Sequence, residues 1–173
     1  MDVMETIKKR YSVRSYQQRD VPDEIIRKIV EAARLAPSAK NRQEWKFVMI
    51  KDVAKRERLC EAAKGQTFVR QSPVVIAGVS TETDYVMTCG VPARYVDIAI
   101  AMEHIALTAV EYGLGTCWVG AFYQDKAKEV LNVPPDCQVV ALMTLGYPEE
   151  GLEPAEKRRK SLEDIMCYEE FKR

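Results

Sequence analysis

Apolar residues recur at helical spacing in two stretches of the chain and predict its two main helices. In the first, residues 23–35, one face carries five apolar side chains: Ile25, Ile26, Ile29, Val30 and Ala33. This helix begins after Pro22 and ends before Pro37, because a residue that precedes proline avoids helical angles. The second, residues 94–112, is apolar around most of its circumference and ends at Gly113, which is typical of a helix central to a core or an interface.

Shorter apolar runs predict strands between these helices. Strands are expected over residues 46–50, 74–79 and 138–145, and a strand or an extended loop over residues 116–122. The run 74–79 contains no polar residue, which favours a strand covered on both faces. Further helices are expected over residues 4–9, 52–64 and 125–131, with a short amphipathic piece over residues 161–168. The elements interleave without a regular repeat and indicate a mixed sheet with helices packed on it.

Composition narrows the class of protein. With 173 residues and 47% hydrophobic content, residues 1–173 are expected to form a single domain. Lysine plus arginine equals aspartate plus glutamate at 26 each, so no global charge attracts nucleic acid or an anionic membrane. No run reaches the roughly 18 to 20 apolar residues of a membrane span, and the charged N-terminal stretch fits no signal or transit peptide. We therefore expect a soluble, cytoplasmic protein in which any anion site is local.

The cysteines and the single histidine predict neither a disulfide framework nor a metal site. The five cysteines, at positions 60, 89, 117, 137 and 167, are irregularly spaced and include no Cys-x-x-Cys pair. His104 is the only histidine, which argues against a nitrogen-rich metal site. We interpret the cysteines as small buried hydrophobic residues in a reducing compartment.

Alternating polar residues near the N-terminus form the first candidate ligand site. Arg10, Ser12 and Arg14 follow a predicted helix, and in an extended backbone residues two apart point the same way. Two guanidinium groups and a hydroxyl would then match the oxygens of one phosphate monoester. The alternative is a solvated turn, since a helix C-terminus attracts cations in any case. Lys157 and Arg159 belong to a basic run that would complete the pocket if folding joined the two ends.

Two later loops have the composition of a surface that receives a flat, polar ligand. Residues 36–45 combine small, hydroxyl and amide side chains, suited to a polyol and a heteroaromatic edge; a capped turn beside a core tryptophan is the alternative. Residues 113–122 place glycines beside Trp118, which lets backbone amides approach a ligand closely. This second loop is not a dinucleotide-binding turn, because it follows a helix and lacks the third glycine.

Six short segments, taken in order, resemble the FMN-dependent nitroreductase family over nearly the whole chain. They are RYSVRSY at 10–16, PSAKNRQEW at 37–45, DIAIAMEH at 97–104, GLGTCWVGAF at 113–122, LGYP at 145–148 and KRRKSLED at 157–164. Each is weak singly, so the specificity comes from their number and order. The resemblance implies an α+β fold, with a mixed sheet sandwiched by helices, in an intertwined homodimer that binds FMN at the subunit interface.

The resemblance also implies which residues bind FMN. Its phosphate and ribityl end would be held by Arg10, Ser12, Arg14, Lys157 and Arg159. The flavin held mainly by the other subunit would be reached by Pro37, Ser38, Ala39 and Asn41. Backbone amides along the isoalloxazine ring, near N5, would come from Trp118, Val119, Gly120 and Ala121. Gln66 is a further candidate, for the pyrimidine edge of the ring.

The implied activity is that of an NAD(P)H oxidoreductase. By this likeness NADH or NADPH passes hydride to flavin N5 and leaves before a nitroaromatic, quinone or related acceptor is reduced, a ping-pong sequence. No catalytic side chain is expected, because the flavin carries the chemistry while the protein orients it. His104, inside the apolar helix, is expected to pack or to hydrogen-bond. The alternatives are a flavin storage or redox-sensor protein without turnover, and a flavin enzyme of different outcome, such as a dehalogenase.

The middle of the chain departs from longer members of the family. Residues 63–93 leave little room for an extra helical excursion over the flavin. The acceptor site is therefore expected to be open, or to be shaped by residues 81–92.

Overall fold

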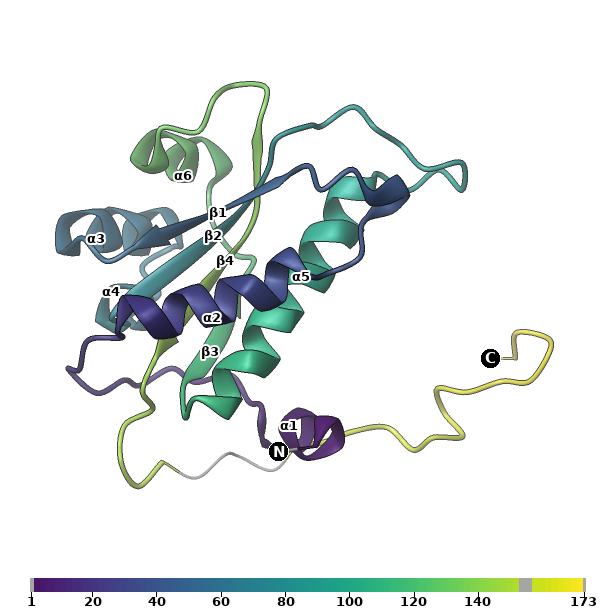
Figure 1. The fold of residues 1–173 in the computed structure, drawn as a ribbon, viewed down its shortest axis with the longest axis horizontal. Helices are drawn as coiled ribbons and strands as arrows, with labels where there is room; N and C mark the ends of the chain where they lie inside the picture. Colours follow the sequence, from purple (N-terminus) through teal and green to yellow (C-terminus); the bar gives the residue numbers. More distant parts are fainter. Residues whose placement is uncertain (1, 153–156, 173) are drawn as a thin grey trace.

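The computed structural model describes residues 2–152 and 157–172, built around a four-stranded sheet (Figure 1). The strands are β1 (Trp45–Ile50), β2 (Val74–Ser80), β3 (Gly115–Val119) and β4 (Gln138–Gly146), in the spatial order β1-β2-β4-β3. All three ladders between them are antiparallel. In the described chain the one parallel pairing is the bridge between Ser12 and Thr116, so the mixed character predicted for the sheet rests on that bridge alone.

Helices cover both faces of this sheet, as the sequence predicted. The helices are α1 (Val3–Lys9), α2 (Asp23–Arg34), α3 (Val53–Ala62), α4 (Thr67–Gln71), α5 (Ala93–Glu111) and α6 (Gln124–Leu131). Figure 1 shows α2 and α5 on one face and α3, α4 and α6 on the other. A single 3₁₀ turn, η1 (Ala39–Asn41), precedes β1. The result is an α+β arrangement of three layers.

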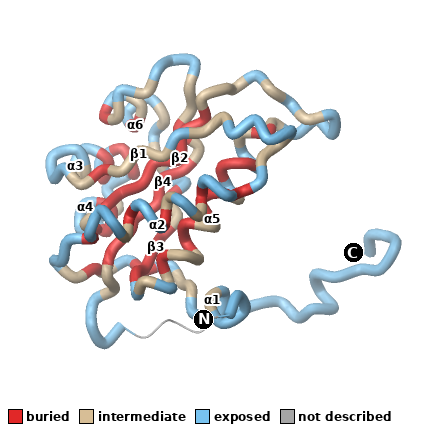
Figure 2. The backbone as a smooth tube through the Cα atoms, viewed as in Figure 1, coloured by how far each residue is buried: buried red, intermediate tan, exposed pale blue. Residues whose placement is uncertain are grey.

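Two expected elements differ in the structure. The helix expected over residues 52–64 ends at Ala62, because Lys64 and Gly65 take left-handed backbone angles, and the separate helix α4 follows. The amphipathic piece expected over residues 161–168 contains only turns. Those residues belong to a tail, 157–172, that runs away from the rest of the molecule with its side chains largely exposed (Figure 2). With no neighbour on which to bury an apolar face, a short helix has little to stabilise it.

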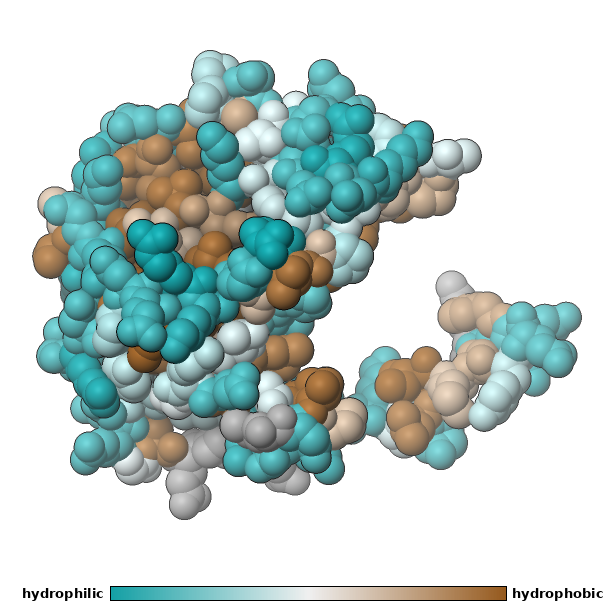
Figure 3. Space-filling model, viewed as in Figure 1, coloured by the Kyte–Doolittle hydropathy of each residue, from teal (hydrophilic) through white to brown (hydrophobic). Residues whose placement is uncertain are grey.

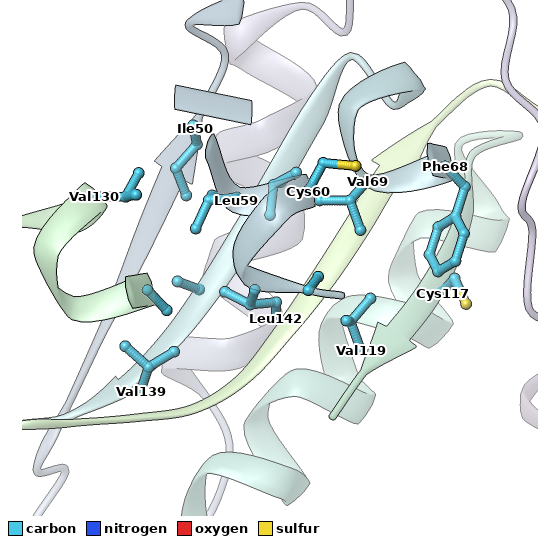
Figure 4. Packing of buried hydrophobic residues seen from close by; sticks show 14 of the residues in the cluster. Ile50, Leu59, Cys60, Phe68, Val69, Cys117, Val119, Val130, Val139 and Leu142 are labelled. Carbon is cyan, nitrogen blue, oxygen red and sulfur yellow. The ribbon is translucent and has the colours of Figure 1, made fainter. Parts of the chain in front are cut away.

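Strand β2 is buried along its whole length, as its continuous apolar run predicted. Alternate side chains point to opposite faces, so Val75 and Ala77 join the core beneath α3, α4 and α6, while Val74 and Ile76 join the core beneath α2 and α5. Figure 4 shows the first of these cores. The burial of this central strand therefore depends on the helices of both layers.

Helix α5 packs closely on the sheet. Eight of its residues are buried: Ala93, Asp97, Ile98, Ala101, Met102, Ile105, Ala106 and Ala109. A Cβ atom added at Gly78 of β2 would lie 2.5 Å from Met102 Sδ and 2.8 Å from Ile98 Cγ2. The contact between helix and strand therefore requires glycine at this position.

The cysteines differ in exposure, and Cys137 is half-buried. Cys60 and Cys117 are buried, and burial raises the pKa of both thiols. Cys89 and Cys167 are exposed, so the interpretation as buried hydrophobic residues is wrong for these two, which lie on the 81–92 loop and the tail. All five are free thiols.

Within the described ranges, no helix combines the length and the hydropathy needed to cross a bilayer. The same residues include no group of three His, Cys, Asp or Glu side chains placed to hold a metal ion.

Replacing Gly78 with alanine is expected to destabilise the protein by about 1–3 kcal/mol, because the added methyl group overpacks the contact between β2 and α5. Urea unfolding of the flavin-free protein measures the change. Gly120→Ala is the matched control, since a Cβ there meets no atom within 4 Å. Equal stability of the two variants would contradict the close approach of α5.

Candidate functional site

The segment from Arg10 to Tyr16 lies in extended form against the edge strand β3. The chain leaves α1 at Arg10 with extended backbone angles, and the Val13 amide donates to the Thr116 carbonyl at 2.9 Å. Val13 is buried, whereas the neighbouring Ser12 and Arg14 are exposed. The alternation predicted from the sequence is thus confirmed, and these two side chains share the outer side of the segment.

Two buried features fix this segment in place. The Tyr16 hydroxyl donates to the Val13 carbonyl at 2.7 Å and shares a 2.6 Å hydrogen bond with the Thr144 hydroxyl on β4. Burial raises the pKa of Tyr16 well above its ordinary value, so this hydroxyl remains a neutral hydrogen-bonding group. At Gly115 an added Cβ would lie 2.3 Å from Val13 Cγ2. The close contact between the segment and β3 therefore depends on a glycine at position 115.

The two ends of the chain meet beside this segment. The Lys157 ammonium group donates to the Lys8 carbonyl at the end of α1. Its pKa is lowered, first by desolvation and then by the nearby Arg10 and Arg159. In the described part of the chain no carboxylate forms a salt bridge with Arg10, Arg14 or the two tail cations. The predicted cluster therefore forms a local positive site whose charges repel one another.

Arg14 connects this cluster to the next layer. Its guanidinium carbon lies 5.7 Å from the centre of the Phe68 ring on α4. It also acts on the buried thiol of Cys117: burial raises the pKa of that thiol, while Arg14 and a hydrogen bond from Ser12 oppose the rise. The basic segment therefore borders both α4 and β3.

Gln66 and the segment after β3 lie together. The Gln66 side-chain amide donates to the carbonyl of Ala121 at 3.2 Å and to that of Ala63 at 2.9 Å. Gly120 and Ala121 are exposed, whereas the Val119 side chain is buried. This arrangement leaves backbone, rather than side chains, available to a flat ligand along 119–121.

Trp118 points away from this exposed backbone. Its side chain packs against the core beneath α2 and α5, and its ring N–H donates to Glu103 of α5 at 3.3 Å. The tryptophan ring is therefore not part of the surface next to Gln66.

The loop that contains Pro37, Ser38, Ala39 and Asn41 lies elsewhere in the same chain. The Ala39 amide donates at 3.0 Å to Asp97, in the first turns of α5, whereas the basic segment docks on β3 just beyond the other end of that helix. Asp97 and Glu111 are fourteen residues apart, or about 21 Å along a helix. One chain therefore does not bring these loop residues to the basic cluster.

Sequence reasoning missed the buried polar groups that hold the candidate residues. Tyr16 and Thr144 anchor the basic segment, and Asp97 anchors the loop. The signal for Asp97 was its place beside apolar residues in a helix expected to be central to the core, where a buried polar group needs a partner. His104 on the same helix bonds the Ala32 carbonyl at 3.0 Å, as expected of a packing or hydrogen-bonding residue.

A groove of about 650 Å³ lies between α2 and β1, apart from all of these residues. Apolar side chains line its floor: Ile26, Val30, Trp45, Phe47 and Met49. Figure 3 shows this apolar surface beside α2. Its chemistry suits an apolar protein surface more than a phosphate-bearing ligand.

Comparison with known proteins identifies the family of the chain. The family model described as the nitroreductase family matches residues 7–82 and 63–147. This chain belongs to the nitroreductase family. A relative from Thermus thermophilus, named NADH dehydrogenase, is 28% identical over 199 aligned residues, covering 97% of this chain and 96% of its own.

Solved structures share the fold. A nitroreductase family protein from Clostridium novyi NT superposes with a TM-score of 0.82 at 35% identity, covering 87% of both chains. An FMN-dependent nitroreductase from Clostridium difficile R20291 superposes with a TM-score of 0.83 at 26% identity, covering 97% of this chain and 99% of its own.

Proposed function

We propose that this chain is an FMN-dependent NAD(P)H oxidoreductase. The observation that carries the proposal is the positive site formed by Arg10, Arg14, Lys157 and Arg159 at the start of β3, with exposed backbone at Gly120 and Ala121 following the end of the same strand. Support comes from the C. difficile relative described as FMN-dependent and the T. thermophilus relative named NADH dehydrogenase.

The residues of the site fit FMN by charge. A phosphate monoester needs cationic donors, and the lowered pKa of Lys157 reports desolvation and crowding by the like charges of Arg10 and Arg159. A bound anion would relieve that repulsion. The exposed Ser12 hydroxyl adds a neutral donor on the same side.

The remaining site residues fit the flavin ring. Gln66 holds the carbonyl of Ala121 and so orients the backbone along which the ring would lie. Gly120 has no side chain, which lets a flat ring approach the main chain. Bound FMN would supply hydride transfer, first from NADH or NADPH and then to a nitroaromatic, quinone or related acceptor.

We propose that residues 81–92 shape the acceptor side of the site. Arg42, next to the 37–41 loop, donates to Glu82 at 3.2 Å, and its guanidinium lies 4.7 Å from the Tyr85 ring centre. These contacts hold the 81–92 loop against the loop that would meet the flavin. Acceptor size would then be limited by Tyr85 and its neighbours.

We further propose that the active form is a homodimer with FMN at the subunit interface. Within one chain, the 37–41 loop and the basic cluster lie at opposite ends of α5, so a second copy is needed for both to meet one flavin. The tail exposes apolar side chains that a second copy would cover: Leu162, Ile165, Met166, Tyr168 and Phe171. Exposed apolar residues of α1 and the groove beside α2 offer matching surface.

Purified protein is expected to be yellow and to lose its flavin absorbance when NADH or NADPH is added without oxygen. Adding a quinone or a nitroaromatic compound should restore the colour. Anaerobic visible spectroscopy measures both steps. A flavin-containing protein that neither nucleotide reduces would favour the storage or redox-sensor alternative.

The double variant Arg10→Ala with Arg14→Ala is expected to bind FMN about 100-fold or more weakly. Each lost charge-assisted hydrogen bond costs about 1.5–3 kcal/mol. Riboflavin, which lacks the phosphate, should bind the variant and the original protein equally. Fluorescence titration of flavin-free protein measures both ligands.

The control for that variant removes two arginines elsewhere, Arg34 and Arg58, which pair with Glu31 and Glu129 on the surface. FMN affinity should be unchanged there. If the Arg10 and Arg14 variant lost riboflavin affinity and FMN affinity equally, these two residues would not be the phosphate site.

Replacing Ile165 and Met166 with serine is expected to shift the protein toward monomer and to weaken FMN retention together. Both side chains are exposed in the single chain and would be buried by a partner. Sedimentation velocity and the flavin-to-protein absorbance ratio measure the two effects. The control is Val53→Ser, which alters an exposed apolar residue on α3. A variant that is monomeric and still fully loaded with FMN would refute the shared site.

A further inference from the structure

A buried carboxylate on α5 holds the loop 37–41. Asp97 is only 8% exposed, and its Oδ1 accepts the hydrogen bond from the Ala39 amide at 3.0 Å. It lies on a helix whose other buried residues are apolar. Burying a carboxylate is costly unless it is hydrogen-bonded. The contact therefore stabilises both groups, because the carboxylate gains a donor and the amide gains an acceptor.

The loop that receives this bond has an unfavourable backbone. Lys40, Asn41 and Gln43 take φ angles of 53°, 54° and 55°. Residues with a Cβ rarely adopt left-handed angles, and such angles persist only where the surroundings enforce them. Three of them within four residues therefore need support from outside the loop.

Bonds inside the loop do not fix it to the body of the protein. The Asn41 amide donates to the Ser38 carbonyl at 2.9 Å, and the Gln43 amide donates to the Ser38 hydroxyl at 3.1 Å. These bonds close the turn upon itself. For residues 37–41, in the described part of the chain, the bond from Ala39 to Asp97 is the only hydrogen bond to another element.

The other end of the loop is held by separate contacts. Arg42 pairs with Glu82, and the Thr81 amide donates to the Glu44 carbonyl. The Lys40 ammonium lies 5.5 Å from the Tyr85 ring, a weak contact at an exposed position. Asp97 is thus the link between the first half of the loop and the rigid helix.

We propose that Asp97 is a positioning residue that sets the loop of Pro37, Ser38, Ala39 and Asn41 in the conformation that meets the flavin. This inference rests on the proposed function. Asp97 acts through the Ala39 amide and does not itself touch the ligand. What the contact requires is an acceptor of the right length at position 97, not a negative charge.

The test compares three variants of the full chain. Asp97→Ala removes the acceptor and is expected to weaken FMN binding about 10- to 100-fold. Asp97→Asn keeps an oxygen at the same distance and should bind FMN within about threefold of the original protein. If Asp97→Ala does not fold, Asp97→Ser serves, because its hydroxyl is too short to reach the Ala39 amide.

His104→Ala is the matched control. His104 lies seven residues further along the same helix and also makes one bond to the backbone of another element, the Ala32 carbonyl. Its loss should lower the melting temperature and leave FMN affinity within about twofold. A loss of FMN affinity in His104→Ala equal to that in Asp97→Ala would overturn the proposal, because a general loss of stability would then explain both.

A second readout needs no flavin. Lys40 and Arg42 are exposed trypsin sites within the loop, so release of the loop in Asp97→Ala should speed cleavage after them in the flavin-free protein, by roughly tenfold. Unchanged cleavage together with unchanged FMN affinity would overturn the role of Asp97. Faster cleavage in a protein whose original form binds no FMN would instead reject the proposed function and leave the structural tie intact.

Discussion

The contact between α5 and the central strand β2 is the constraint on which the rest of the structure depends. The helix lies so close to the sheet that Gly78 cannot carry a side chain against Met102 and Ile98. This packing fixes the height and direction of α5 across the sheet. Its first turns then carry Asp97 to the loop before β1, and its end leads through Gly113 to Gly115, where the basic segment docks.

The length of α5 separates the two halves of the candidate site. The basic cluster lies at one end of α5, where β3 begins, and the 37–41 loop lies near the other end, about 21 Å away along the helix. A rigid helix cannot shorten, so the halves meet only if they come from different copies. The dimer we propose follows from this geometry, and the detached apolar tail gives the second copy a surface to bind.

Buried polar groups do the positioning at both ends. Tyr16 and Thr144 pin the basic segment to β4, and Asp97 pins the strained loop to α5. At each end a buried polar side chain bonds to main chain, Tyr16 to the Val13 carbonyl and Asp97 to the Ala39 amide. Ser12, Arg14 and Asn41, three of the candidate site residues, are exposed, so their positions depend on these anchors.

Local sequence was sufficient for most elements and for the chemistry of the first candidate segment. The apolar run 74–79 has no polar face, which predicts a strand covered on both sides. Ser12 and Arg14 lie on the same side of their segment because side chains alternate in an extended chain. The end of α3 at Ala62, two residues before the expected end, was less visible in the sequence, because it depends on left-handed backbone angles at Lys64 that a lysine side chain does not favour.

The gathering of distant residues was decided by tertiary structure alone. The residues around Lys157 do not indicate that it lies next to Lys8 and Arg10. The residues around Ala39 likewise do not indicate that its amide bonds to Asp97. Both contacts join residues that are far apart in the sequence, and they form only because packing brings their elements together. The sequence by itself determined which side chains could bind an anion and a flat ring. The length of α5 decided which of them share one chain's site, because the packing of that helix on the sheet fixes how far apart the elements at its two ends lie.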